Sequence, residues 1–278
     1  MKLTVLVDNN TLIDRYLIGE PGVSYLIECD GKKILFDTGY SDVFLKNAQI
    51  LRIDLTELDG IVLSHGHNDH SGGLNHLVQY YDRALYIPEK KIKLIYHPDA
   101  LIHKCFESKP IGVSYRLDQS DFFFERISTK ETYRITEHIT FLGQIPRNSN
   151  FETTETIGHT YDKTGKLSRD HVLDDSALVV RTKEGLVVVT GCSHSGISNI
   201  IEHAKQVTGE THIASVIGGF HLQNADESTL LKIGCYFKKL SPDLLYPCHC
   251  TDLEAKIRLS SYVKVKEVGV GLRLHFPV

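Results

Sequence analysis

The chain has 278 residues, of which 41% are hydrophobic and 24% charged, a composition ordinary for a soluble globular protein. It excludes a disordered, collagen-like or coiled-coil chain, and no apolar run approaches the roughly 18 to 20 residues that span a bilayer. The formal net charge of −4 disfavours a nucleic-acid-binding surface, because such a surface needs a basic excess. We therefore expect neither a membrane nor a nucleic acid as a partner.

The first apolar run, residues 3–7, is too short for the core of a signal peptide, so we expect a cytoplasmic protein. Six cysteines are too few for a disulfide-stabilised scaffold. The histidine content is unusual: 15 histidines accompany one methionine and no tryptophan. Histidine has no advantage in packing, so this surplus directs attention to metal binding.

The first third of the chain alternates short strand patterns with turns and helices. The segment 60–63 is wholly apolar, which is typical of a strand buried on both faces. The predicted elements are strands at 3–7, 24–29 and 33–36, a helix at 41–49 with Ser41 as its N-cap, a strand at 60–63 and a helix at 71–81.

The middle of the chain, about 82–150, is the least regular part, and we expect an insertion-like region there with one strand at 139–142. Regular patterns return at residue 176. The predicted elements are a hairpin of 177–181 and 186–190, a helix at 197–208, strands at 213–217, 244–246 and 268–274, and helices at 226–240 and from 252. Because no flexible linker separates these runs, we predict two similar halves packed as a single domain, 1–278.

The strongest functional signal is the segment Ser64-His65-Gly66-His67-Asn68-Asp69-His70, directly after the buried strand at 60–63. The two histidines at 65 and 67 lie two apart in an extended segment, so both rings can point to the same side. Asp69 and His70 come where the chain turns into a helix and can face a second point nearby. Imidazole nitrogen and carboxylate oxygen together suit Zn²⁺, Mn²⁺ or Fe²⁺.

This segment resembles the metal-binding signature of the metallo-β-lactamase superfamily, and Phe36-Asp37-Thr38-Gly39 resembles the Asp-x-Gly turn that precedes it in that family. The resemblance implies an α/β fold, an αββα sandwich of two mixed sheets flanked by helices, with metals at one sheet edge. Segments near 145, 174, 190, 218 and 247 resemble one subgroup, the metal-dependent hydrolases. One branch of that subgroup is described as a dihydropterin-(ribofuranosyl)aminobenzene-phosphate synthase of methanopterin-type cofactor assembly.

The resemblance, applied residue by residue, assigns His65 and His67 to one metal and Asp69 and His70 to the other. His194 follows the predicted strand at 186–190 and matches the third histidine of the first metal. The last ligand of the second metal corresponds to His249, after the strand at 244–246. The implied cofactor is a pair of divalent metal ions, with zinc favoured and manganese or iron as alternatives.

The sequence departs from the superfamily pattern where a bridging aspartate is expected, because that strand end reads Gly191-Cys192. Three alternatives follow: Cys192 is a thiolate ligand, Asp175 reaches in, or water alone bridges the metals. The segment Gly158-His159-Thr160 matches only half of the family's third-histidine pattern, so we expect no ligand there. Cys248-x-Cys250 lacks a second pair that would complete a structural zinc site.

Other residues have predicted roles around these ligands. Asp69 and His221 are the predicted catalytic residues, with His221 hydrogen-bonding a leaving group or phosphate. Arg147 and Asn9 are the predicted substrate contacts; the planar guanidinium of Arg147 suits bidentate binding of phosphate or carboxylate. Asp37 is expected to orient a ligand histidine.

These features predict a metal-dependent enzyme whose binuclear site activates water or a phosphate or pyrophosphate leaving group on a small phosphorylated or pterin-like substrate. One alternative is a dihydropterin synthase-type transferase, and a second is a nuclease or phosphodiesterase of the same fold. A flavo-diiron oxygen reductase would have glutamate at the place of His67, and a non-catalytic relative would have lost ligands. A homo-oligomer is left open.

Overall fold

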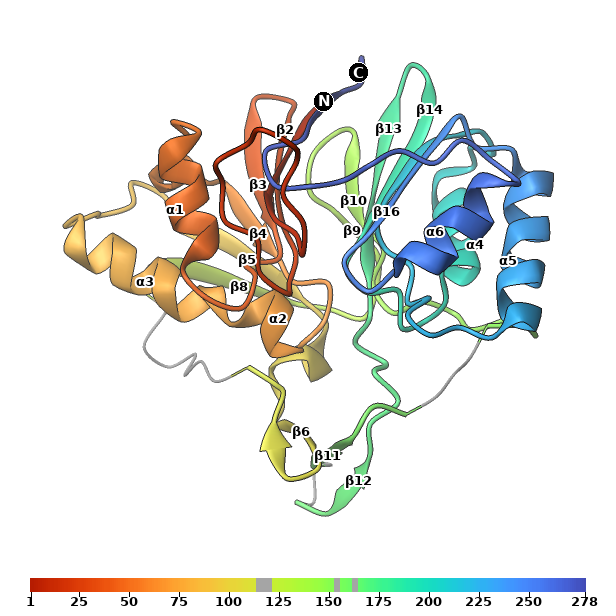
Figure 1. The fold of residues 1–278 in the computed structure, drawn as a ribbon. Helices are drawn as coiled ribbons and strands as arrows, with labels where there is room; N and C mark the ends of the chain where they lie inside the picture. The colour runs from red at the N-terminus through yellow and green to blue at the C-terminus, as the bar shows by residue number, and fades with distance from the viewer. Residues whose placement is uncertain (114–121, 153–155, 162–164) are drawn as a thin grey trace.

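The computed structural model describes residues 1–113, 122–152, 156–161 and 165–278. Two large sheets face each other in the middle of the molecule, and helices cover the outer face of each (Figure 1). This is the αββα sandwich of mixed sheets that the resemblance implied. Both chain termini lie together at one end of the sandwich (Figure 1).

The first sheet has seven strands and comes mainly from the first half of the chain. Its strands, in spatial order, are β17 (Arg273–His275), β1 (Lys2–Val7), β2 (Ser24–Cys29), β3 (Lys32–Phe36), β4 (Gly60–Val62), β5 (Ile92–Tyr96) and β8 (Phe124–Ser128). Pairing is antiparallel from β17 to β3 and parallel from β3 to β8. The parallel strands therefore deliver their carboxyl ends to one edge of the sheet.

The second sheet has six strands and comes from the second half of the chain. Its strands, in spatial order, are β16 (Leu244–Cys248), β15 (Ile213–Gly219), β14 (Gly185–Thr190), β13 (Ala177–Thr182), β10 (Ile139–Phe141) and β9 (Tyr133–Arg134). Strands β14, β15 and β16 are parallel, and the others pair antiparallel. The predicted 177–190 hairpin is confirmed as β13 and β14.

The helices pack through apolar stripes. In α4, residues 197, 200, 201 and 204 are buried, the i, i+3, i+4, i+7 spacing of one helix face. The first sheet carries α1 (Val43–Ile50), α2 (Asn68–Ser71) and α3 (Gly73–Arg83), and the second carries α4 (Ile197–Thr208), α5 (Glu227–Leu240) and α6 (Leu253–Ser260). Two short 3₁₀ helices are η1 (Leu55–Glu57) and η2 (Pro98–Leu101).

Three apolar clusters follow from this layering. One lies between the two sheets and includes Phe36, Phe141 and Ile217, each fully buried. A second fills the space between the first sheet and its helices, and a third does the same behind the second sheet. Burial on both faces explains why the central strands read as continuous apolar runs.

A small third sheet projects from the sandwich at the end opposite the termini (Figure 1). It consists of β12 (Leu167–Arg169), β11 (His159–Tyr161), β6 (Lys104–Phe106) and β7 (Lys109–Pro110), all antiparallel. The region predicted as insertion-like, about 82–150, contributes strands to all three sheets over its described residues. The number of domains stays a prediction.

One predicted helix start is wrong. Helix α1 begins at Val43 with Asp42 as its N-cap, whereas Ser41 was predicted to cap it. The Ser41 hydroxyl instead donates to the carboxylate of Glu20 at 2.6 Å, while its oxygen accepts the Val43 N–H at 3.3 Å. The contact with Glu20, which is distant in sequence, therefore engages the Ser41 hydroxyl that the local pattern predicted as the helix cap.

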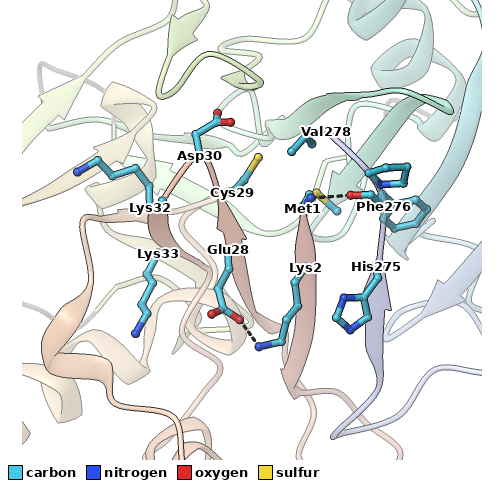
Figure 2. A pocket seen from close by; sticks show the side chains of 12 residues that line it. Met1, Lys2, Glu28, Cys29, Asp30, Lys32, Lys33, His275, Phe276 and Val278 are labelled. Carbon is cyan, nitrogen blue, oxygen red and sulfur yellow. Dashed lines mark hydrogen bonds and ion pairs between the residues drawn. The ribbon is translucent and has the colours of Figure 1, made fainter.

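The end of the sandwich that holds the termini contains a hollow of about 650 Å³ (Figure 2). Two pairs of its polar groups are in contact: Lys2 forms an ion pair with Glu28 at 2.5 Å, and the Met1 amino group donates to the Phe276 carbonyl at 2.6 Å. It contains no predicted site residue. Among the described residues, no helix is both long and apolar enough to cross a membrane.

Candidate metal centre

The predicted metal ligands meet where the carboxyl ends of the parallel strands of both sheets come together. The histidine motif follows β4 and runs into α2, so the first sheet supplies His65, His67, Asp69 and His70. The second sheet supplies His194 after β14 and His249 after β16. Ligands from both halves of the chain therefore share one edge of the sandwich.

Three histidines form a first cluster of donor atoms. Nε2 of His65 lies 2.9 Å from Nδ1 of His67 and 3.2 Å from Nε2 of His194. All three side chains are buried. Ring nitrogens this close repel each other unless a proton or a cation lies between them, so the cluster has the chemistry of a cation site.

A second cluster lies beside the first. Nε2 of His249 is 3.3 Å from Nε2 of His70 and 3.4 Å from Oδ2 of Asp69. The Cys192 thiol completes it, with Sγ 3.1 Å from His70 Nε2 and 3.2 Å from His249 Nε2. The donor atoms of these four residues all lie within 4.8 Å of one another. The Cys192 sulfur also lies within 4.8 Å of the His65 and His194 nitrogens, so it faces both clusters.

The donor set fits a pair of divalent metals. Burial holds the pKa of His65 and of His194 well below the usual value, and it lowers the pKa of His67 to about 4. These imidazoles are therefore neutral at pH 7 and carry the lone pairs that a metal requires. Nitrogen, carboxylate and thiol donors together suit zinc, with manganese or iron also compatible with the nitrogen and oxygen donors.

Asp37, predicted to orient a ligand, lies directly behind both clusters. Its Oδ2 is 2.7 Å from His70 Nδ1 and accepts the Ser64 hydroxyl at 2.7 Å, while Oδ1 accepts the Ser64 N–H at 2.7 Å. Because the Ser64 hydroxyl donates to Asp37, its oxygen accepts from His65 Nδ1, which is 2.9 Å away. The proton of each imidazole is thus held on Nδ1, and Nε2 of His65 and His70 is left for a metal.

Asp8 and Asn9, which directly follow β1, hold His249 in position by hydrogen bonds. Asn9, predicted as a substrate contact, has its Oδ1 2.9 Å from His249 Nδ1. Asp8 accepts the backbone N–H of His249 at 3.1 Å. The amide of Asn9 therefore lies behind a ligand, and its predicted role toward substrate stays a prediction.

The remaining predicted residues lie at different distances from the clusters. The exposed His221 ring meets the His194 ring edge to face, with 4.5 Å between the ring centres. Arg147 is turned to the main chain, with Nη2 donating to the carbonyls of His171 and Val172 at 2.7 and 2.9 Å. Asp175 is buried; its Oδ2 accepts the Ser195 N–H at 2.8 Å, and burial raises its pKa to about 6. His159 lies on β11 of the small sheet and is exposed.

Strained backbone marks this edge of the sandwich. Asp37, Ser193, His221 and His249 all have φ between 52° and 61°, a left-handed conformation uncommon for residues other than glycine. Each follows the end of a parallel strand and turns its chain sharply at the site. Such conformations persist where surrounding contacts hold them, and they cluster at functional sites.

Comparison with known proteins agrees with this geometry. A model described as the metallo-β-lactamase superfamily matches residues 17–249. The chain belongs to this superfamily. An uncharacterised protein, MJ0448 of Methanocaldococcus jannaschii, is 34% identical over 93% of each chain.

Two further proteins similar to this chain have names that state a function. The 7,8-dihydropterin-6-methyl-4-(β-D-ribofuranosyl)-aminobenzene-5′-phosphate synthase of M. jannaschii is 31% identical over 84% of this chain and 82% of that protein. The crystal structure of Tm1679, titled a metal-dependent hydrolase of the β-lactamase superfamily, superposes with a TM-score of 0.83 at 32% identity over the whole of both chains. These names belong to a hydrolase and to a synthase.

Two residues around the site, Ser64 and Lys104, carry no functional signal in the sequence alone. Ser64 acts through one hydroxyl, and Lys104 is a single charged residue at the start of the short strand β6. Neither has a spacing pattern that a single sequence could reveal.

Proposed function

We propose that this protein is an enzyme with two divalent metal ions, zinc being favoured. His65, His67 and His194 would hold one ion, and Asp69, His70 and His249 the other. The convergence of these six side chains from three segments into two adjoining clusters carries the proposal. It is supported by the neutral, buried state of the first three imidazoles.

We further propose Cys192 as a thiolate ligand that faces both ions. Its sulfur lies near the donor atoms of both clusters, in the position where the family pattern places an aspartate. The Asp175 carboxylate, the other candidate from this chain, accepts the Ser195 N–H through Oδ2 and belongs to neither cluster of donor atoms among the described residues. This geometry favours Cys192 over Asp175.

The pair of ions, when bound, would lower the pKa of a coordinated water and neutralise charge on a phosphoryl or carbonyl oxygen. The Asp69 side chain is 31% exposed and places one oxygen near His249. Against the opposing effect of burial, the neighbouring charge of His70 holds the pKa of this carboxyl well below its usual value, so Asp69 would be an ionised ligand, and its catalytic role stays a prediction. The His221 ring is exposed beside His194 and can donate a hydrogen bond to an anionic oxygen of a substrate. The Asp37 carboxylate keeps the His70 proton on Nδ1.

The substrate class is a small phosphorylated or pterin-like molecule. Support comes from the synthase relative, whose name includes both a dihydropterin and a phosphate, and from the cationic character of a binuclear centre. A hydrolase is supported by the name of the Tm1679 structure and a transferase by the name of the synthase. A nuclease or phosphodiesterase is the weaker alternative, because the chain has a net charge of −4.

The first test is the metal content of the anaerobically purified protein by elemental analysis. We expect about two ions per chain in the wild type, and fewer in His65→Ala and in His249→Ala. The matched control is His159→Ala, an exposed histidine on β11, which should retain the wild-type content. The absence of metal in the wild type, even after reconstitution, would overturn the proposal.

If the ions are present, turnover is measured on phosphate esters, diphosphates and pterin diphosphates. Wild type, His67→Ala and Asp69→Asn are compared, and both variants should lose activity while they keep the circular dichroism of the wild type. Full activity in either variant would contradict its assigned role.

A further inference from the structure

A buried lysine lies beside the metal centre and takes no part in the ligand set. Lys104 begins β6 of the small sheet and is 1% exposed. Its Nζ donates to Oδ2 of Asp170 at 2.7 Å and to Oδ1 of Asp174 at 2.9 Å, and both carboxylates are buried. Removing three charged groups from water is costly and is often no more stabilising than apolar packing. A role beyond stability is therefore worth testing.

One of the two carboxylates reaches the histidine motif. Oδ2 of Asp174 accepts the backbone N–H of Gly66 at 2.8 Å. Gly66 separates the ligands His65 and His67, so this hydrogen bond holds the peptide between them. On its other side, a Cβ at Gly66 would lie 1.9 Å from the carbonyl oxygen of Ala100. The motif therefore passes through a narrow gap, held from one side by Asp174.

The main chain of the same lysine reaches the motif by a second route. The Lys104 carbonyl accepts the N–H groups of Ile111 and Gly112 at 3.0 and 3.2 Å. Gly112 in turn forms a β-bridge with His67, and the Asn68 N–H donates to the Ile111 carbonyl at 2.8 Å. The start of β6 is thus connected to the histidine motif twice: the Lys104 side chain acts through Asp174, and the Lys104 carbonyl acts through Ile111 and Gly112.

Asp170 serves as an internal comparison. It binds the same Nζ at nearly the same distance and is buried to a similar degree, but its other oxygen accepts the N–H of Val172 at 2.8 Å. Among the described residues, the Asp170 carboxylate bonds to Lys104 and Val172 and makes no contact with the histidine motif. A purely structural ion cluster would make the two aspartates equivalent, whereas a positioning role would distinguish them.

We propose that Lys104 and Asp174 are positioning residues of the metal centre. Lys104 holds the Asp174 carboxylate, which holds the Gly66 peptide, and this peptide sets the separation of His65 Nε2 and His67 Nδ1. The inference rests on the proposed binuclear centre. It states that these two residues raise the metal affinity of the cluster formed by His65, His67 and His194.

The test compares Asp174→Asn with Asp170→Asn, two isosteric changes that each remove one charge from the same cluster. The metal-free proteins are titrated with Zn²⁺ in competition with a chelating dye, and their stabilities are measured by urea unfolding. His194→Ala identifies which of the binding events belongs to the three-histidine half. We expect Asp174→Asn to weaken that event by about 10- to 100-fold, the range for residues that orient a ligand. Asp170→Asn should leave it unchanged, with a comparable loss of stability in both variants.

Equal zinc affinities in the two variants, with normal binding by the wild type, would overturn the positioning role and leave the proposed function intact. A wild type that binds no zinc would instead overturn the proposed function. If Asp174→Asn does not fold, Lys104→Arg is the second test. This change keeps the positive charge but displaces the N–H donor that contacts the Asp174 carboxylate. It should weaken the same event, and unchanged zinc affinity in this variant would contradict the proposal.

Discussion

At the scale of single residues, the position of one proton determines what a histidine can bind. The Asp37 carboxylate accepts from Ser64 and from His70, and Ser64 in turn accepts from His65. Each step fixes a proton on Nδ1 and leaves Nε2 as a lone-pair donor. A histidine pattern predicts the ligand residues, but the nitrogen used depends on neighbours from other segments.

Cys192 provides the prediction at this scale. In cobalt-substituted protein, a thiolate ligand produces a charge-transfer absorption in the near ultraviolet. We expect this band in the wild type and its loss in Cys192→Ser, because the Cys192 sulfur faces both clusters.

The control for this prediction is Cys248→Ser. Cys248 is equally buried, but its thiol lies 3.1 Å from the hydroxyl of Tyr25, on the inter-sheet side. This variant should keep the band. Persistence of the band in Cys192→Ser would show that another thiolate supplies the sulfur, and absence of the band from the wild type would show that no thiolate is bound. Either result would contradict the prediction.

At the scale of elements, helix starts illustrate what local pattern can and cannot predict. Asp226 and Asp252 cap α5 and α6 by accepting the N–H groups of Thr229 and Ala255, each at 2.8 Å. Both caps lie next to their helices in sequence, which is why both helix starts were predicted. Helix α4 differs, because Gly196 precedes it and offers no side chain.

The cap of α4 comes from a distant segment, and this leads to a stability prediction. The Glu152 carboxylate accepts the N–H of Ser198 at 2.9 Å and that of Asn199 at 3.3 Å. Glu152→Ala should lower the free energy of unfolding by about 1 kcal/mol, as expected for loss of a cap. Urea unfolding measures this, with the exposed Glu89→Ala as a control expected to be neutral. An effect no larger than that of the control would refute the capping role.

At the scale of the whole molecule, the metal centre depends on how the two sheets face each other. The first sheet supplies four predicted ligands and the second supplies the others, and the apolar cluster between the sheets sets their relative position (Figure 1). Residues far from the two donor clusters therefore influence the candidate site through packing.

Phe141, fully buried on β10, tests this packing. Phe141→Ala should lower the free energy of unfolding by about 3–5 kcal/mol, because it opens a cavity between the sheets. The control is Phe106→Ala on the small sheet, where the side chain is 48% exposed and the change should stay within about 0.5 kcal/mol. Chemical denaturation compares the two, and similar losses would contradict the assignment of the main core.

The sequence by itself determined most of the longer elements, because these depend on local periodicity. Its compact histidine motif resembles that of the superfamily, and the sandwich fold was what this resemblance implied. It also identified the histidines and the aspartate of that motif, whose convergence follows from their spacing along a single turn. The short strands of the small sheet escaped it, since exposed strands of two or three residues have no apolar pattern.

Only the tertiary structure decided which distant groups meet. It brought Cys192 between two sets of donors, turned Asn9 and Arg147 toward neighbouring residues, and connected Lys104 to Gly66 through Asp174. The physical reason is the same in each case. These contacts join strand ends and loops whose relative positions are set by sheet pairing and core packing, and no spacing along the chain encodes them.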